Sequence, residues 1–370
     1  MIFLLLVLPF LAKAVTTYTC TTSGPWTSSV TWGGSGPPTS IDNVVIPNTF
    51  TVTVNASSGI TNIIINSGGT LVMGSSGVTL TVTGNLSNAG TFSPGSGSTV
   101  IFGGGSNQNI GGAGTTTFDY LTISPSVGTV TVSLGQAITI NNTFTISNGT
   151  FDSQTFQVTG SSGGNISMAS GTTMLLGVAT NVTSVAFPTG YTASGISLSS
   201  SSTVVYQANT SAQPISTIPL YGNLQIASNG PTTKTPSSSS SINIAGNLNI
   251  SSTLTTFSLG TNTINLTGNA TIQGTLAFST GSFNIAGNFT NNGAYSAGTG
   301  LTTFNGSAAQ TIGGSIPATF YDLTIAPSSS VTVTLGSNEN IYDNLTISAG
   351  TLDVSASGSY SLSIGNKFIL

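Results

Sequence analysis

The sequence predicts an all-β protein whose chain winds into a parallel β-helix, a fold also called a β-solenoid. Apolar residues alternate with Thr, Ser or Asn in many short runs, such as TVTVN at 51–55 and ITINNTFTI at 138–146, and this period of two is typical of strands. Turns rich in Gly, Ser and Asn separate the runs, and strands return after about 20 residues or fewer, as expected when each coil stacks on the previous one. Apolar side chains would then fill the interior, and Asn and Thr side chains would form ladders at the turns.

The chain begins with an apolar run that is typical of a secretion signal. Residues 2–11 are followed by Ala12-Lys13-Ala14, the small-x-small form of a signal-peptidase site. A run of about 10 apolar residues is well short of the ~20 needed to span a bilayer. We therefore interpret residues 1–14 as a signal peptide, with an uncleaved membrane anchor as the alternative. The mature chain would lack a transmembrane segment and would be extracellular or attached to a cell surface.

The next segment, residues 15–47, is predicted to cap the N-terminal end of the solenoid. It contains both tryptophans, Trp26 and Trp32, and the Pro37-Pro38 pair, at which no strand can continue. Solenoids need such end caps because open strand edges pair with other chains. The single cysteine, Cys20, excludes an internal disulfide.

Residues 48–370 form the predicted solenoid, built from about three units of about 100 residues each. The sequence at 84–152 aligns with the sequence at 287–353, and a weaker copy lies midway, at 202–226. Sandwich domains also have about 100 residues, so tandem β-sandwich domains are the alternative fold. The Ser/Pro tract PTTKTPSSSSS at 231–241 is predicted to be a loop that leaves the solenoid wall.

Two parts of the chain resemble known extracellular proteins. The segment GPWTSSVTWGGSGPPTSIDNVVIP at 24–47, with TVTV after it, resembles the opening of many secreted right-handed parallel β-helix proteins. These include bacterial and archaeal surface proteins and the domain family named for its eight glycines. The units that contain QNIGG and TFDYLTI resemble repeats of large surface adhesins. The resemblance implies an extracellular β-helix with surface or adhesive roles, and it implies no catalytic residues.

The chain carries very little charge, and this limits the chemistry that it can perform. It has three Lys, no Arg, no His and seven acids, which is 3% charged residues, whereas ordinary domains have about 25%. A net charge of −4 and the lack of Arg exclude nucleic acid as a partner. We expect no metal site and no cofactor, because there is no His, one Cys and no calcium-loop spacing.

A catalytic role for the acidic residues is the less favoured interpretation. A glycoside hydrolase needs two carboxylates close together, and the candidates are Glu339 with Asp343 or Asp353. In the repeat alignment Asp353 matches Asp152 and Asp343 lies opposite Asn142, as expected of turn residues rather than catalytic ones. We therefore predict a non-catalytic protein, and the alternative is a polysaccharide-binding or polysaccharide-cleaving β-helix.

Two features of the sequence concern carbohydrate. Thirteen N-x-S/T sequons are candidate N-glycosylation sites of a glycoprotein; they are Asn55, Asn85, Asn141, Asn148, Asn165, Asn181, Asn209, Asn249, Asn265, Asn269, Asn288, Asn305 and Asn344. A sugar-binding groove would need exposed aromatic rings, and the available tyrosines are Tyr120, Tyr206, Tyr221, Tyr295 and Tyr321. Most of these are expected to pack in the interior or at turns, because Phe118 and Phe320 hold equivalent positions in the repeat. We predict that both of these phenylalanines are buried.

The sequence thus predicts an extracellular structural or adhesive protein, a rod-like scaffold that could form filaments. Its partners would be further copies of itself, arranged head to tail, or other components of the cell surface. The residues Gly365-Asn366-Lys367-Phe368 match the opening of a new unit. We therefore expect either a fragment of a longer repeat protein or an end that docks on the next subunit.

Overall fold

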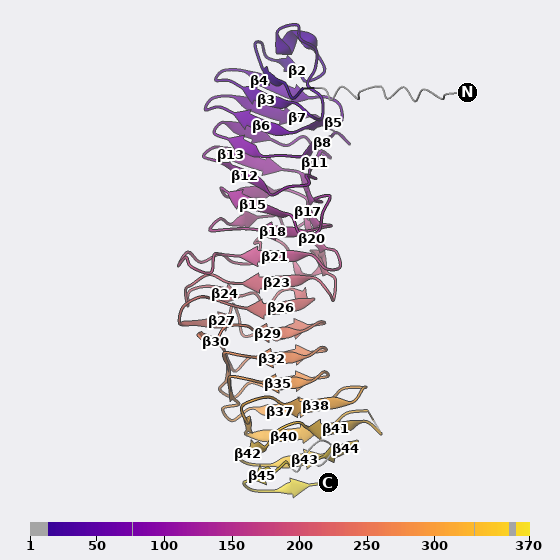
Figure 1. The fold of residues 1–370 in the computed structure, drawn as a ribbon, viewed down its shortest axis with the longest axis vertical. Coiled ribbons are helices and arrows are strands. Elements are labelled where there is room, and N and C mark those ends of the chain that lie inside the picture. The colour runs from indigo at the N-terminus through magenta and orange to yellow at the C-terminus, as the bar shows by residue number, and fades with distance from the viewer. Residues whose placement is uncertain (1–13, 76, 329, 355–359) are drawn as a thin grey trace, which may run out of the picture.

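The strand ladders of the described residues are all parallel, and they stack the chain into one long column (Figure 1). This computed structural model describes residues 14–75, 77–328, 330–354 and 360–370, so the predicted signal peptide lies outside the described residues except for Ala14. The column is a parallel β-solenoid of about 16 turns. The predicted fold class is confirmed, and the alternative of tandem β-sandwich domains is wrong.

Each coil contributes strands to three faces of the column. The first face is one continuous sheet of sixteen strands: β1 (Thr17–Thr19), β3 (Asn43–Ile46), β6 (Asn62–Ile65), β9 (Leu86–Asn88), β12 (Gln108–Gly112), β15 (Thr131–Gly135), β18 (Thr150–Asp152), β21 (Thr173–Leu176), β23 (Thr203–Tyr206), β26 (Asn223–Ile226), β29 (Leu248–Ile250), β32 (Ala270–Ile272), β35 (Phe289–Asn291), β38 (Gln310–Gly313), β41 (Thr332–Leu335) and β44 (Thr351–Asp353).

The second face is divided into a seven-stranded and an eight-stranded sheet. The first of these holds β2 (Gly24–Pro25), β4 (Thr51–Val54), β7 (Thr70–Met73), β10 (Thr91–Ser93), β13 (Thr115–Phe118), β16 (Ile138–Ile140) and β19 (Val158–Thr159). The other holds β24 (Pro214–Ile215), β27 (Thr232–Pro236), β30 (Thr255–Gly260), β33 (Thr275–Phe278), β36 (Ala294–Ser296), β39 (Thr319–Phe320), β42 (Glu339–Ile341) and β45 (Leu362–Ile364).

The third face is divided at the same level of the column. Its seven-stranded sheet holds β5 (Ser58–Ile60), β8 (Thr79–Val82), β11 (Thr99–Phe102), β14 (Tyr120–Ile123), β17 (Thr143–Ile146), β20 (Asn165–Met168) and β22 (Ile196–Leu198). Its eight-stranded sheet holds β25 (Leu220–Tyr221), β28 (Ile242–Ile244), β31 (Ile264–Leu266), β34 (Phe283–Ile285), β37 (Leu301–Phe304), β40 (Asp322–Ile325), β43 (Leu345–Ile347) and β46 (Phe368–Ile369). Two short 3-10 helices, η1 (Ser29–Trp32) and η2 (Ala193–Gly195), lie between strands.

The alternation of apolar and polar residues decides which side chains enter the interior. In β11, Val100 and Phe102 are buried, while Thr99 and Ile101 face outward and are half-buried. The same alternation recurs along all three faces, so one continuous apolar core runs through the column. The repeat equivalents Phe118 and Phe320 are both fully buried, as predicted.

The Gly-Asn dipeptides form ladders at one corner of the column. Along this corner each Asn side-chain oxygen accepts a hydrogen bond from the backbone N–H of the next Asn, at 2.7–2.8 Å, through Asn223, Asn247, Asn269 and Asn288. The glycines allow the coils to approach: a Cβ at Gly268 would lie 2.2 Å from the carbonyl oxygen of Gly246. Only glycine fits such a contact, which explains why the dipeptide recurs.

The two tryptophans lie in the first coil, at the N-terminal end of the column. Trp26 and Trp32 are both buried and pack edge to face, with ring centroids 5.3 Å apart, and the Trp32 indole nitrogen donates to the Trp26 carbonyl at 2.7 Å. β1 and β3 flank this segment and are the first two strands of the sixteen-stranded sheet. Residues 15–47 are thus continuous with the solenoid, and the tryptophans fill its first coil.

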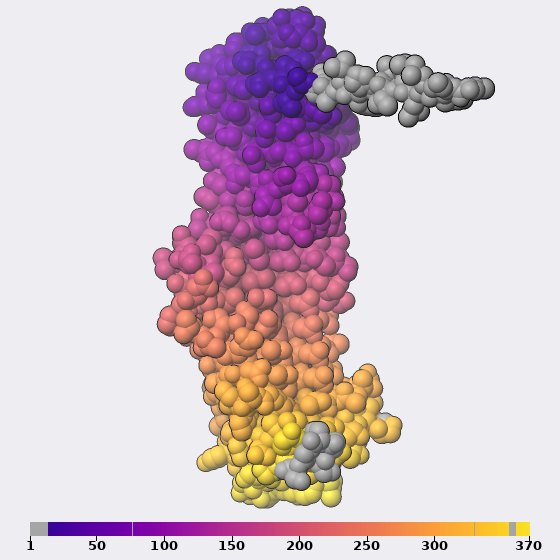
Figure 2. All heavy atoms as spheres, viewed as in Figure 1, coloured from indigo at the N-terminus to yellow at the C-terminus, as the bar shows by residue number. Residues whose placement is uncertain are grey.

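The second and third faces are interrupted where residues 177–195 join β21 to β22, and the space-filling view shows a wider body near this level (Figure 2).

The prediction of a loop at 231–241 is wrong for its first half, since Thr232–Pro236 is β27, paired with β24 and β30. Lys234 of this strand is fully buried. Its ammonium donates to the carbonyl oxygens of Ala208 and Thr210 and to the side-chain oxygen of Gln213. Three acceptors match its three donors, which explains how a lysine is accommodated there.

The middle repeat copy is rotated by one face relative to the other two. The middle copy begins with β23, which lies on the first face, whereas the matching strands of the outer copies, β11 and β37, lie on the third. Over the stretch that all three copies share, each nevertheless closes one coil, because β11 pairs with β14, β23 with β26 and β37 with β40. The repeated motif therefore encodes one complete coil and not a position on a particular face.

A buried network of two tyrosines connects β23, β25 and the turn after β24 within one coil. The hydroxyls of Tyr206 and Tyr221 are 2.8 Å apart. The Tyr206 hydroxyl accepts from the Ser216 N–H at 3.1 Å, and the Tyr221 hydroxyl donates to the Ser216 carbonyl at 2.7 Å. Tyr206 must therefore donate to Tyr221, which satisfies both buried hydroxyls.

We expect the fold to be lost cooperatively in strong alkali. Burial raises the pKa of Tyr206, Tyr221 and Tyr295 above the ordinary value of 10.0, so the unfolded chain ionises first and stability falls as the pH rises above about 10. Lys234 acts oppositely: burial lowers its pKa to about 8, so the folded chain loses this proton first and stability rises slightly between pH 8 and 10.5. The circular dichroism signal should be lost above pH 10 together with a cooperative rise in tyrosinate absorbance from the buried tyrosines. Ionisation of all nine tyrosines before any loss of structure would contradict the prediction.

Candidate functional site

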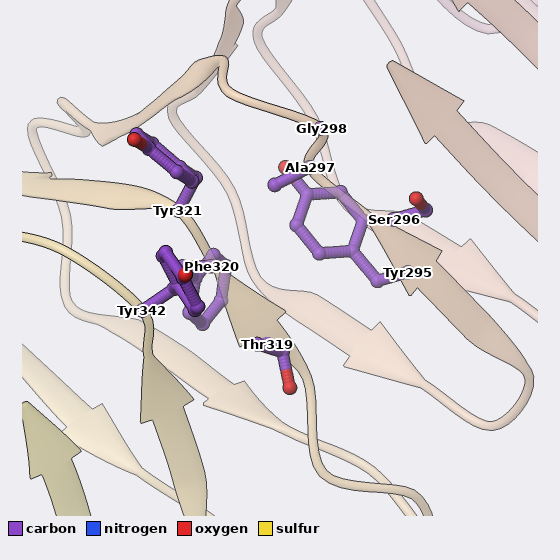
Figure 3. A pocket seen from close by; sticks show the side chains of 8 residues that line it. All are labelled: Tyr295, Ser296, Ala297, Gly298, Thr319, Phe320, Tyr321 and Tyr342. Atoms are coloured by element: carbon purple, nitrogen blue, oxygen red, sulfur yellow. The ribbon is translucent and has the colours of Figure 1, made fainter. Parts of the chain in front are cut away.

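Two tyrosines form a stacked pair on the outside of the column, at the corner between its second and third faces. Tyr321 follows β39, and Tyr342 follows β42 one coil later. Their rings are nearly parallel, at 22°, with centroids 5.5 Å apart (Figure 3). Tyr342 is 70% exposed, and Tyr321 is half-buried. We call Tyr321 and Tyr342 the tyrosine pair.

The strand register places a glycine on each side of the pair. Ser296 pairs with Thr319, Phe320 with Ile341, and Ile341 with Ile364. Continued past the strand ends, this register places Gly298, Tyr321, Tyr342 and Gly365 in one row along the corner. The row lies one residue beyond the pairs made by Ile341 and two residues beyond the Ser296–Thr319 pair. The glycines have no side chains to cover the rings, so space remains above and below the pair.

Two open hollows occupy this space. The first has a volume of about 450 Å³ and is lined, besides the pair, by Tyr295, Ser296, Ala297, Gly298, Thr319 and Phe320 (Figure 3). The second has a volume of about 640 Å³ and is lined, besides Tyr342 and Thr319, by Asn340, Ile341, Asp343, Gly365 and Asn366. The hollows share Thr319 and Tyr342, so they lie next to each other along the axis of the column. We call the two hollows together the groove.

The pair is absent from the equivalent coils of the first repeat unit. There the register pairs Phe118 with Ile140, so Asp119 and Asn141 hold the two corner positions. The sequence FDYL at 118–121 becomes FYDL at 320–323, which moves a tyrosine from the strand to the corner. The sequence analysis considered Tyr321 but missed Tyr342. The signal that could have found it is the exchange of Asn141 for Tyr342 in the same repeat alignment.

The other predicted tyrosines have structural positions. Tyr206, Tyr221 and Tyr295 are buried, which confirms that most of the candidates pack inside. Tyr120, the first residue of β14, faces outward and is half-buried. The tyrosine pair is thus the place where candidate aromatic residues reach the surface with a groove beside them.

The structure does not bring the candidate catalytic acids together. Glu339 points into the core and is 1% exposed; its carboxylate accepts from the Ala318 N–H and the Ser337 hydroxyl, both at 2.6 Å. Asp343 lies outside, in the turn after β42, and accepts from the Asn366 amide at 2.7 Å. Asp353 belongs to β44 on the first face. A carboxylate pair across a groove, as hydrolysis requires, is not formed by these three residues.

The remaining acids support turns and coil contacts. Asp42, fully buried, accepts from the backbone N–H groups of Thr16 and Thr39 at 3.0 and 2.9 Å. Asp119 accepts from the Gly97 N–H at 2.6 Å. In the described part of the chain no group of three or more His, Cys, Asp or Glu could hold a metal ion. Cys20 is buried, and burial raises the pKa of its thiol.

We expect the protein to tolerate acid. Burial raises the pKa of Glu339 and of Asp152 above their ordinary values, so the folded chain takes up these protons before the unfolded chain does, and acidification through that range stabilises the fold. The chain has only seven acids in 370 residues, so few carboxylates are left whose protonation would destabilise the fold. The melting temperature, followed by calorimetry, should be nearly constant from neutral pH to about pH 3. A steep fall over this interval would be inconsistent with this account.

The thirteen sequon asparagines all lie in the described residues, and none is buried. Nine are exposed and four, at positions 148, 209, 249 and 344, are half-buried. Asn269 and Asn288 already use their side-chain oxygens in the corner ladder. Glycosylation of these asparagines stays a prediction. The described residues contain no helix that is long and apolar enough to cross a membrane.

Comparison with known proteins gives one match. A model of the G8 domain family matches residues 31–129, which is about a quarter of the chain and runs from η1 through β14. The expected likeness to the eight-glycine domain family is therefore confirmed over these coils. Searches of curated proteins and of solved structures found no significant match. The tyrosine pair lies outside the range that the G8 model matches.

Proposed function

We propose that this protein is an extracellular structural protein, a stiff rod with an adhesive outer surface that belongs to a cell surface or an extracellular filament. The observation that carries the proposal is the sixteen-stranded sheet, which continues from β1 to β44. Each coil is hydrogen-bonded to the next along this sheet, so bending the rod would strain many bonds at once. The apolar signal-like segment and the G8 match support an extracellular location.

The outer surface suits repeated weak contacts better than chemistry at one point. It presents Thr, Ser and Asn at regular intervals, and the carboxylates that could act together are separated on different faces or buried. Identical groups repeated at the coil spacing can bind a repetitive partner by multivalency, in which each contact is weak and the sum is strong. Glycans on the exposed sequons would supply the solubility that charges supply in other proteins.

Head-to-tail association of rods belongs to the same proposal. The fold grows by stacking one parallel strand on another, and a second rod can continue this pairing as an unclosed heterologous contact. Light scattering of purified residues 15–370 over a range of concentrations tests it. We expect elongated particles whose mass grows with concentration, and a monomer at all concentrations would refute the filament.

The location is tested on intact cells of the protein's own host. Immunogold labelling with an antibody against the folded rod should mark the cell surface or extracellular fibres, and mass spectrometry of the isolated protein should find an N-terminus at Val15. Label confined to the cell interior, together with retention of residues 1–14, would refute an extracellular role.

A further inference from the structure

We propose that the tyrosine pair and its groove bind a neutral polysaccharide. The inference rests on the proposed extracellular adhesive role and names the ligand class of one site within it. A sugar ring presents a face of C–H groups, which packs well on the electron-rich face of an aromatic ring. The rings of Tyr321 and Tyr342 stack at 5.5 Å, and the glycines on either side leave hollows in which sugar rings can lie against them.

The groove offers hydrogen-bonding groups where sugar hydroxyls would lie. Thr319, Ser296 and Asn340 are exposed and line the two hollows. Their hydroxyl and amide groups both donate and accept, which suits the hydroxyls of a sugar. Because the two hollows lie next to each other along the column, the groove fits several linked sugars better than one.

Charge favours a neutral ligand over an acidic one. Asp343 lines the second hollow and would repel the carboxylates of acidic polysaccharides. Of the lysines in the described residues, Lys234 is buried, and Lys367 is exposed in the turn beside Asn366 without lining either hollow. No basic side chain in the described residues therefore lines the groove to pair with an anionic sugar.

The repeat comparison indicates that the pair was not required by the fold. In the first unit, Asp119 and Asn141 hold the same corner positions in an otherwise equivalent pair of coils. A large ring that is 70% exposed contributes little to stability. An exposed ring stacked on a half-buried one beside a groove, at positions where the fold accepts Asn and Asp, indicates a ligand rather than packing.

Affinity electrophoresis and calorimetry test the proposal on purified residues 15–370, with neutral polysaccharides (a soluble β-glucan, xyloglucan and mannan) and acidic ones (polygalacturonate and alginate). We expect the chain to bind at least one neutral polysaccharide and no acidic one. Tyr342→Ala should weaken binding about tenfold, and the double variant Tyr321→Ala/Tyr342→Ala should abolish it. Tyr120→Ala removes an outward-facing tyrosine of the first unit and is the matched control, with unchanged affinity.

A conservative variant protects the test against a change in folding. Tyr321→Phe/Tyr342→Phe keeps both rings, and we expect it to retain binding. Binding of acidic polysaccharides only, or binding that the double alanine variant leaves unchanged, would overturn the proposal. So would a self-associated wild type that Tyr342→Ala converts to monomers, because the surface would then belong to a second copy. Failure to bind any polysaccharide refutes this ligand class and leaves the surface location, tested on cells, standing.

Discussion

Replacement of Phe320 by Ala is expected to lower the free energy of unfolding by about 3–5 kcal/mol, because it leaves a cavity in a core that cannot collapse around it. The ring is fully buried. It packs against Tyr295, Phe289 and Phe304, with centroid separations of 5.4, 5.9 and 6.3 Å. These rings come from the three faces of the preceding coil, on β36, β35 and β37, so the cavity would loosen contacts along the column as well as across it.

Phe118→Ala tests the same position in the first repeat unit. Phe118 is also fully buried, but it contacts one other ring, that of Phe92 at 5.1 Å. We therefore expect a loss within the same range and near its lower end. Denaturant unfolding gives the total change, and hydrogen exchange shows whether opening stays near the altered coil, as expected of a fold in which each coil contacts its neighbours. Thr303→Ala, on the outer side of β37, is the control; a loss below about 1 kcal/mol for both phenylalanines would show that the core repacks.

The inward or outward direction of residues in regularly alternating strands could be predicted from the sequence. In β11 the apolar residues Val100 and Phe102 enter the core as their alternation requires. In β37 Phe304 does the same, although Thr302 is buried and Leu301 is exposed. The Gly-Asn ladder was also predictable, because the dipeptide recurs and asparagine can bond to its copy in the next coil. Such features depend on local pattern and on the stacking of like residues.

The lateral register of the coils was not predictable, because coil lengths vary with the turns. Whether Tyr342 lies above Tyr321 depends on how many residues each intervening turn takes up, and small insertions in the turns are tolerated. For the same reason, the shift of the middle repeat copy to another face could not be predicted from the sequence. Lys234 was placed in a loop because it lies in a Ser/Pro-rich tract. Its burial depends on three acceptors that the fold brings from elsewhere in the chain.

Gln310 and Gln108 stabilise the solenoid by hydrogen bonds between their side chains and the backbone. Both side chains are buried in the interior. The Gln310 side-chain oxygen accepts from the Gly306 N–H at 2.8 Å, and its nitrogen donates to the carbonyls of Ile285 and Gly287 at 3.1 and 2.7 Å. Gln108 makes the equivalent three bonds in the first unit. Each glutamine thus gives a partner to an N–H of its own turn and to a glycine carbonyl of the previous coil, and it adds a second donor to a carbonyl, that of Ile285 or Val82, which already accepts from a backbone N–H.

Gln310→Leu is expected to lower the free energy of unfolding by about 2 kcal/mol or more, because the Gly306 N–H and the Gly287 carbonyl lose their partners and each unsatisfied group costs about 1–3 kcal/mol. Gln108→Leu should have the same effect. Gln225→Leu, the same substitution at a half-buried residue on the outer side of β26, should change stability little.

Gln310→Glu tests whether the glutamine stabilises the fold by its hydrogen bonds or by its packing. The ionised carboxylate keeps the acceptor and loses both donors, and the protonated carboxyl regains one donor. Its stability should therefore rise as the pH falls, while that of Gln310→Leu should not. Equal pH profiles for the two variants, measured by urea unfolding, would show that the glutamine acts by its shape and not by its hydrogen bonds.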